Sequence, residues 1–131
     1  MDEVYSMPNM GLFVYGTLLK DEANSGLVRH LSSLPAKVHG ALYQMPAGYP
    51  AMVLGGQQWV HGEYLAEPDS RLLDILDVYE GVHENLYQRV PVDVVVGLVR
   101  HHAWTYIMKN PKRKGGKPIR GGRWRRANWR M

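Results

Sequence analysis

The chain has 131 residues, of which 45% are hydrophobic and 21% charged, and this composition suits one globular domain with its own hydrophobic core. It contains no cysteine, which excludes disulfides, thiol catalysis and cysteinyl metal sites, and no apolar run reaches the roughly 18–20 residues of a membrane span. The N-terminus lacks the basic and then apolar pattern of a signal peptide, so we expect a cytoplasmic protein.

The formal net charge of +4 is unevenly distributed along the chain. Ten of the 16 lysines and arginines, and none of the 12 acidic residues, lie from residue 109 onward. The first 108 residues therefore carry six cations against twelve anions. This pattern predicts an acidic domain over 11–108 and a basic extension over 109–131. Residues 1–10 are predicted to be a loose leader, because Pro8 and Asn9 break any regular pattern.

The first predicted strand covers residues 11–15 and ends abruptly at Gly16, with the polar Thr17 after it. Because glycine adopts backbone angles that other residues avoid, such a turn can leave N–H groups facing a carboxylate or phosphate. The same pattern is also that of the plain end of a buried strand. The stretch alone does not decide between the two readings.

A helix is predicted next over residues 21–34, because Leu27, Val28 and Leu31 form an apolar stripe and Pro35 would end it. Strand character returns around Gly40, where the glycine indicates a bulge or a close approach of another backbone. The strands expected in this region cover residues 38–43, 52–54 and 59–65, with a turn at Gly55-Gly56.

The clearest amphipathic helix begins at Pro68-Asp69-Ser70 and runs to Tyr79, and Gly81 supplies its C-cap. Its predicted apolar positions are Leu72, Ile75, Leu76 and Tyr79. Two further strands are expected over residues 87–96 and 98–108. About six short strands and two main helices predict an α+β fold, a small mixed β-barrel flanked by helices.

Glu80 follows Leu76 by four residues and Leu73 by seven, so it projects near the apolar face of this helix. Burial and the negative end of the helix dipole both disfavour its ionised form and should raise its pKa. Such a carboxyl can accept and return a proton near neutral pH, although a glutamate that simply reaches water at the helix end is the alternative.

Other chemistry has less support in the sequence. Glu63, after Gly62 on a predicted strand, is a second candidate interior carboxylate, whereas Asp74 and Asp77 are interpreted as solvated charges. The six histidines show no metal-binding spacing, and no P-loop or dinucleotide-binding glycine motif occurs.

Taken in order, several short motifs resemble the γ-glutamylcyclotransferase-like superfamily, which includes the AIG2-like proteins and the γ-glutamylamine cyclotransferases. The resemblance spans about residues 11–108, and its specificity comes from the order and spacing of the motifs. The matching stretches are Val14-Tyr15-Gly16-Thr17-Leu18, Gly40-Ala41-Leu42-Tyr43, Gly48-Tyr49-Pro50-Ala51, Val60-His61-Gly62-Glu63, Leu76-Asp77-Val78-Tyr79-Glu80-Gly81, Tyr87-Gln88-Arg89 and Ala103-Trp104-Thr105-Tyr106.

The resemblance implies an enzyme in which the α-amine of a γ-glutamyl substrate attacks its own γ-carbonyl, giving 5-oxoproline and a released amine or amino acid. The family's catalytic glutamate falls on Glu80, as general acid and base. Its glycine-turn motif falls on Tyr15, Gly16, Thr17 and Leu18, which would bind the substrate. Tyr87 is implied as a hydrogen-bonding residue on the substrate side, and no metal or cofactor is implied.

Two features depart from the family pattern. The family's closing glycine–acidic–tryptophan motif corresponds here to Gly122-Arg123-Trp124, with a cation in the acidic place. The basic extension is also not predicted by the family. It could be a solvated segment, a lid that folds back with Trp124 near the site, or a surface for nucleic acid, since it interleaves tryptophan with arginine.

Function is therefore open between a cyclotransferase, a non-catalytic module of the same fold that binds a small carboxylate, and nucleic-acid association through the extension. The sequence does not name the γ-glutamyl compound or its leaving group, and it leaves the oligomeric state open.

Overall fold

The computed structural model describes residues 10–16 and 25–124. The expected leader, the segment 17–24 with Thr17 and Leu18, and the last seven residues lie outside the described residues. None of the helices among the described residues is long and apolar enough to cross a membrane.

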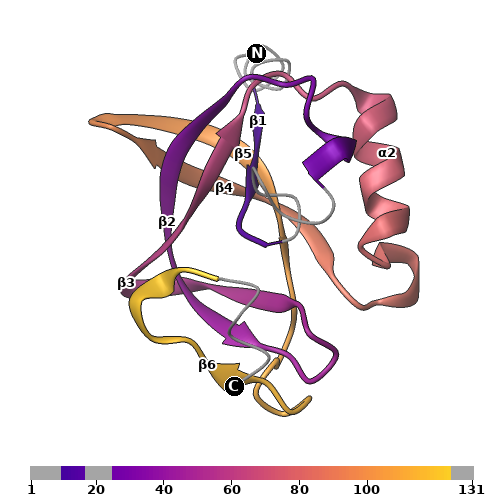
Figure 1. Cartoon of the computed structure of the whole chain (residues 1–131), viewed down its shortest axis with the longest axis vertical. Helices are drawn as coiled ribbons and strands as arrows, with labels where there is room; N and C mark the ends of the chain where they lie inside the picture. The colour runs from indigo at the N-terminus through magenta and orange to yellow at the C-terminus, as the bar shows by residue number, and fades with distance from the viewer. Residues whose placement is uncertain (1–9, 17–24, 125–131) are drawn as a thin grey trace, which may run out of the picture.

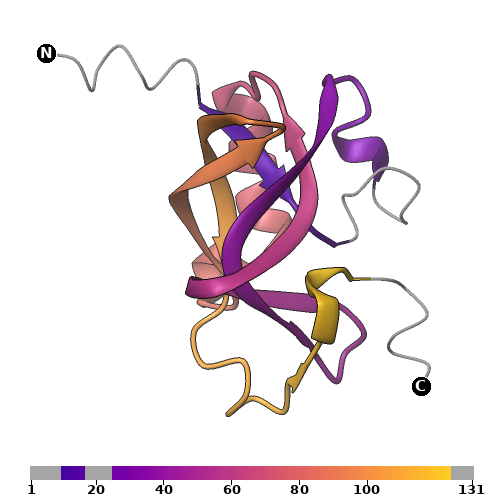
Figure 2. The same ribbon diagram turned by 90° about the vertical axis from the view of Figure 1, so that its left-hand side faces the viewer.

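Five strands wrap into a small closed barrel, as Figures 1 and 2 show from two directions. The strands are β1 (Gly11–Val14), β2 (Ser33–Gln44), β3 (Pro50–Leu65), β4 (Gln88–Val96) and β5 (Val99–Ile107). Their order is β3-β1-β5-β4-β2, and β2 pairs again with β3 to close the ring. Because β1 runs parallel to β5 while the other pairs are antiparallel, the barrel is mixed. The predicted fold class is confirmed.

The short strand β1 separates two parts of the hydrophobic core. Side chains alternate along a strand, so Leu12 and Val14 face one side while Phe13 and Tyr15 face the other. The first pair packs with the helix α2 (Ser70–Tyr79), and the second pair packs inside the barrel with Val38, Met52 and other strand residues. This strand therefore lies between the helix and the barrel interior.

Helix α2 forms where the sequence predicts it and lies along one side of the barrel (Figure 1). Asp69 caps it, since its Oδ1 accepts a hydrogen bond of 2.8 Å from the Leu72 N–H, and Gly81 follows with a left-handed φ of 68°. The buried positions are Leu72, Leu73 and Leu76, whereas the predicted Ile75 and Tyr79 are 47% and 41% exposed. The buried face is thus rotated toward Leu73, and Glu80 continues it.

The prediction of a helix over residues 21–34 is wrong for residues 25–34, the part that the structure describes. Residues Ser25–Leu27 form one turn of 3-10 helix (η2), and β2 begins at Ser33, which pairs with Leu65. The apolar spacing that suggested a helix reflects only neighbouring residues. The strand forms instead because its backbone hydrogen-bonds to β3, which is distant in the sequence. Pro35 lies at the exposed start of β2 and ends no helix.

The two strands predicted over residues 52–54 and 59–65 form one long strand, β3. The predicted turn at Gly55-Gly56 lies inside it, with φ of 101° and 85°, where the register against β2 shifts between His39 and Gly40. The predicted bulge or close approach at Gly40 is confirmed, because a Cβ there would lie 2.5 Å from the carbonyl oxygen of Val53.

The segment after β5 packs against the end of the barrel (Figure 2). Its strand β6 (Lys117–Pro118) pairs with the end of β2, and a 3-10 turn, η4 (Arg120–Gly122), follows. Trp124 is only 4% exposed, packs in the barrel core, and donates a hydrogen bond of 2.9 Å to Gln44 Oε1. A third 3-10 turn, η3 (Val82–Glu84), follows α2.

Candidate active site

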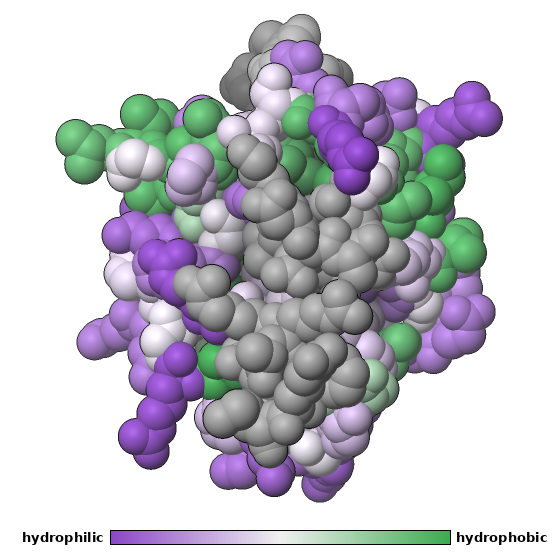
Figure 3. Space-filling model, in the orientation of Figure 1, coloured by the Kyte–Doolittle hydropathy of each residue, from purple (hydrophilic) through white to green (hydrophobic). Residues whose placement is uncertain are grey.

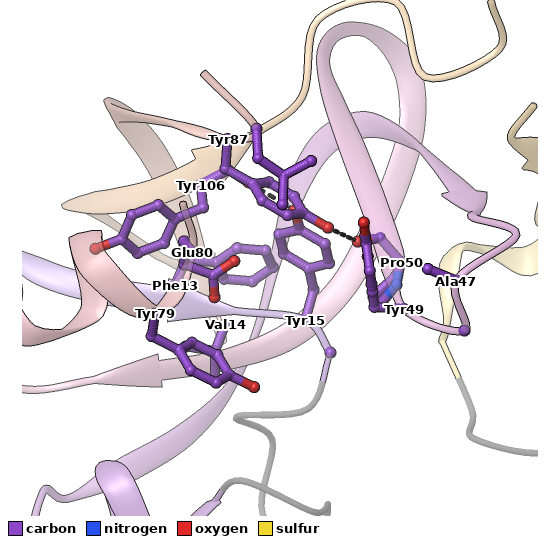
Figure 4. A pocket seen from close by; sticks show the side chains of 13 residues that line it. Phe13, Val14, Tyr15, Ala47, Tyr49, Pro50, Tyr79, Glu80, Tyr87 and Tyr106 are labelled. Atoms are coloured by element: carbon purple, nitrogen blue, oxygen red, sulfur yellow. Dashed lines mark hydrogen bonds between the residues drawn. The ribbon is translucent and has the colours of Figure 1, made fainter. Parts of the chain in front are cut away.

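A cavity of about 360 Å³ lies between the end of β1, the β2–β3 turn and the C-terminal end of α2 (Figure 4). Its walls are largely aromatic. The lining residues are Phe13, Val14, Tyr15, Gly16, Ala47, Gly48, Tyr49, Pro50, Tyr79, Glu80, Leu86, Tyr87 and Tyr106. Four of the six residues expected at the site, Tyr15, Gly16, Glu80 and Tyr87, come together here from separate elements. Thr17 and Leu18 lie outside the described residues.

Glu80 ends helix α2, where its backbone N–H donates a hydrogen bond of 2.8 Å to the carbonyl oxygen of Leu76. Its carboxylate points into the cavity among aromatic rings (Figure 4), and no described residue that lines the cavity is a cation. Burial raises the pKa of Glu80 to about 7. The expectation of a raised pKa is confirmed, with burial as its cause.

Gly16 is required for its small size, not for an unusual backbone angle. It is absent from the residues with a positive φ, whereas a Cβ at this position would lie 2.7 Å from Pro50 Cγ. The end of β1 and the β2–β3 turn therefore approach each other more closely than any side chain at position 16 would allow. This contact sets the width of the cavity on that side.

Three tyrosines of the cavity wall, Tyr15, Tyr87 and Tyr106, donate hydrogen bonds from their hydroxyls to the protein itself. Tyr15 donates a hydrogen bond of 2.6 Å to the carbonyl oxygen of Tyr106, and Tyr87 donates to that of Pro50. Burial raises the pKa values of both hydroxyls, so they keep their protons at neutral pH. With the proton engaged, each phenolic oxygen has lone pairs left, so the tyrosines can act as hydrogen-bond acceptors toward a ligand.

Asp77 is not the solvated charge that the sequence suggested. Its carboxylate accepts hydrogen bonds of 2.8 and 3.2 Å from Arg89 and of 2.7 Å from the Tyr106 hydroxyl. Burial acts to raise the pKa of Asp77, but the bonds from Arg89 and Tyr106 hold it below its usual value. The Arg89 guanidinium also lies 4.6 Å from the centre of the Trp104 ring.

Sequence reasoning missed most of the cavity wall. Tyr106 and Tyr49 belong to motifs that were noted, but nothing in their spacing indicates that they face Glu80. The position of Asp77, three residues before Glu80 on one helical face, was the available signal for its buried role. Glu63 lies on β3 opposite Val14 and does not line the cavity. Among residues 10–16 and 25–124, no cluster of three acidic or histidine side chains could hold a metal ion.

The sequence matches the family model described as gamma-glutamyl cyclotransferase, AIG2-like, over residues 12–126. Among solved structures, YkqA of Bacillus subtilis is 27% identical with a TM-score of 0.71. The match covers 88% of this chain and 39% of YkqA, so the chain spans about two fifths of that protein.

Two more distant structures share the fold. An AIG2-like protein of Mus musculus is 22% identical with a TM-score of 0.62, covering 77% of this chain and 78% of the mouse chain. A structure named gamma-glutamyl cyclotransferase is 16% identical with a TM-score of 0.64, covering 84% and 69%. No curated protein sequence matches the chain significantly.

Proposed function

The chain belongs to the gamma-glutamyl cyclotransferase, AIG2-like family, and on this premise we propose that it cyclises a γ-glutamyl amide to 5-oxoproline. In this reaction a bond forms between the α-nitrogen and the γ-carbonyl carbon. The bond between that carbon and the leaving nitrogen breaks, and an amine or amino acid is released. The nucleophile belongs to the substrate, so the site mainly has to fold the glutamyl group until its α-nitrogen lies next to its γ-carbonyl carbon.

Glu80 moves the proton in this proposal. Its carboxylate accepts one proton from the α-ammonium group, and the free amine attacks the γ-carbonyl carbon. Protonated Glu80 then gives that proton to the leaving nitrogen as its bond to carbon breaks. A second proton leaves the α-nitrogen as the ring amide forms, and the released amine takes up one proton from Glu80 or water. The number of protons is thus conserved.

The observation that carries the proposal is a half-buried glutamate with a pKa of about 7, whose carboxylate points into a cavity with many aromatic side chains in its wall. A carboxyl with this pKa is partly ionised and partly protonated at neutral pH, so it can take a proton and return it within one turnover. An ordinary exposed glutamate is too weak a base for the first step at the same pH.

The tyrosines around Glu80 suit the same substrate. The hydroxyls of Tyr15 and Tyr87 donate hydrogen bonds to backbone carbonyls, so their oxygen lone pairs are left to accept from a cation such as the α-ammonium group. The turn that starts at Gly16 is proposed to bind the substrate carboxylate or the developing oxyanion through backbone N–H groups. The two ends of the glutamyl group would thus meet different walls of the cavity.

The test is release of 5-oxoproline from a panel of γ-glutamyl amines, γ-glutamyl dipeptides and glutathione. We expect at least one compound to be turned over, and Glu80→Gln to abolish turnover because the amide cannot accept the proton. Glu67→Gln, at an exposed glutamate away from the cavity, is the matched control and should keep full activity.

If the wild type binds members of the panel saturably and releases no 5-oxoproline, the catalytic proposal is wrong. That outcome would favour the alternative of a module that binds a small carboxylate. Equal binding by wild type and Glu80→Gln, again without product, would support the same conclusion.

A further inference from the structure

The segment after β5 carries a strong positive charge on a fixed scaffold. Seven cations between residues 109 and 123 are exposed, and no acidic residue lies among them. They are Lys109, Lys112, Arg113, Lys114, Lys117, Arg120 and Arg123. In the space-filling view, hydrophilic side chains are visible along the lower edge of the molecule (Figure 3), and this segment lies at the same end in Figure 1.

The backbone of this segment is anchored. The Ile119 N–H donates to the carbonyl oxygen of Leu42, the Gly116 N–H donates to that of Pro111, and β6 pairs with β2. None of the ion pairs found within residues 10–16 and 25–124 involves any of the seven cations. None of these seven charges is therefore held in a direct ion pair within the described part of the protein.

Aromatic rings lie beside these cations at two places. A shallow hollow lies between the basic loop and the barrel, and its lining is Tyr43, Val53, Asn110, Pro111, Lys112 and Arg113. On the outer face of β2 and β3, His39 stacks on Trp59 with 3.6 Å between ring centroids, and Lys37 lies 4.4 Å from the centroid of the same tryptophan.

The second place is also positively charged. Burial lowers the pKa of His61 on β3, and the positive charges of Arg123, which follows η4, and of Lys37 on β2 lower it further. The basic segment therefore connects the hollow at Tyr43 with the aromatic cluster at Trp59 around the end of the barrel.

We propose that the surface formed by residues 109–123 and Tyr43 binds single-stranded nucleic acid, with the cations on the phosphates and the tyrosine ring against a base. Single strands suit this surface better than duplexes, because an unpaired base can stack on a half-buried ring at the surface while the backbone follows a row of cations. An acidic protein segment could pair with the cations but would have no base to stack on the ring of Tyr43. This inference does not depend on the proposed cyclotransferase activity.

The test uses the full chain and a labelled single strand of about 12 nucleotides, as oligo(U) and as oligo(dT), with binding measured by fluorescence anisotropy. If four phosphates meet these cations, affinity should fall about 50-fold between about 50 and 200 mM salt. A preference for oligo(U) or oligo(dT) distinguishes RNA from DNA. Tyr43→Leu, which keeps an apolar side chain, should weaken binding about fivefold or more.

The deciding variant carries Lys112→Glu, Arg113→Glu and Lys114→Glu, and it should lose at least tenfold in affinity. Its matched control carries Arg29→Glu, Arg71→Glu and Arg100→Glu, which change the net charge equally at exposed positions on other elements. Circular dichroism of both variants checks that they are folded.

Three results would overturn the proposal. One is the absence of salt-dependent binding by the wild type at low salt. Another is an equal loss in the two charge-reversed variants, which would indicate attraction by net charge alone. The third is binding of polyglutamate as tight as that of either oligonucleotide, which would point to an acidic protein partner.

Discussion

At the scale of single residues, Glu80 combines a proposed chemical role with a cost in stability. Its carboxyl is withdrawn from water, no described lining residue is a cation, and its pKa rises from 4.5 to about 7. The folded protein therefore binds this proton more tightly than the unfolded chain does. Between these two pH values the unfolded chain releases the proton first, so folding stability falls as pH rises.

We expect Glu80→Gln to remove this pH dependence, because glutamine does not ionise. A pKa difference of about 2.5 units corresponds to about 3 kcal/mol, so the variant should gain up to about 3 kcal/mol over the wild type above pH 7. Near pH 4.5 the gain should vanish. Urea unfolding of both proteins at about pH 5 and about pH 8 measures it, and a pH-independent difference would contradict the assignment.

Gly16 is the second residue at which a small change should affect the site. In Gly16→Ala the new methyl group would meet Pro50 Cγ at 2.7 Å, so the end of β1 and the β2–β3 turn must separate. We expect kcat/KM for the γ-glutamyl substrate to fall about tenfold or more while the fold is kept. Steady-state kinetics together with a thermal melt separate the two effects.

Gly26→Ala is the control for this change, because a Cβ at Gly26 would meet nothing within 4 Å. It should leave both activity and melting temperature close to those of the wild type. Equal activity in the two variants would show that the close approach at Gly16 is not needed.

At the scale of elements, Asp77 joins helix α2 to the β4–β5 hairpin. Arg89 comes from β4 and Tyr106 from β5, and both bind the carboxylate of Asp77 one helical turn before Glu80. The side chains of Arg89 and Asp77 are only 23% and 15% exposed, so water screens this pair less than a surface pair. The contact fixes the end of the helix from which Glu80 projects.

Asp77→Asn should therefore affect both stability and activity. It leaves the half-buried guanidinium of Arg89 without its counter-charge, which we expect to cost roughly 1–3 kcal/mol. It also lets the helix end shift, so kcat should fall by about tenfold while KM changes less. Urea unfolding and steady-state kinetics on the same preparation give the two numbers.

Asp74→Asn is the matched control, since Asp74 lies one turn earlier on the same helix and is exposed. A loss of stability in Asp77→Asn with kcat unchanged would mean that the ion pair supports the fold without positioning Glu80.

Elements with local signals were predictable from the sequence, and elements defined by distant partners were not. The helix over 70–79 has its cap, its apolar spacing and Gly81 within a few residues, so local chemistry determines it. The strand that begins at Ser33 and the irregularity at Gly55-Gly56 depend on the pairing of β2 with β3, which no local pattern contains. For the same reason Glu80 was identified from its own helix, whereas Tyr106 and the role of Asp77 needed the folded chain.

At the scale of the whole molecule, two surface features stand out from the barrel. The end of the β4–β5 hairpin projects from the body, where the space-filling view shows apolar surface and where the Leu98 side chain is fully exposed (Figures 1 and 3). The basic segment, in contrast, lies against the barrel and contributes Trp124 to the core. Positive charge and core packing are thus combined in one stretch of chain.

Trp124→Ala tests how far the barrel depends on this stretch. Removing an indole that is 4% exposed leaves a large cavity in the core cluster that also contains Phe13 and Val60, and we expect it to cost about 3–5 kcal/mol. Trp124→Phe keeps most of the packing but leaves the Gln44 amide oxygen without its donor, so its cost should be nearer 1–2 kcal/mol. Urea unfolding of the three proteins gives both values.

If Trp124→Ala were as stable as the wild type, the segment would be an extension that the barrel does not need. The expected loss in the free energy of unfolding would instead mean that this segment is part of the barrel core. A chain shortened after residue 108 should therefore be less stable than the full chain.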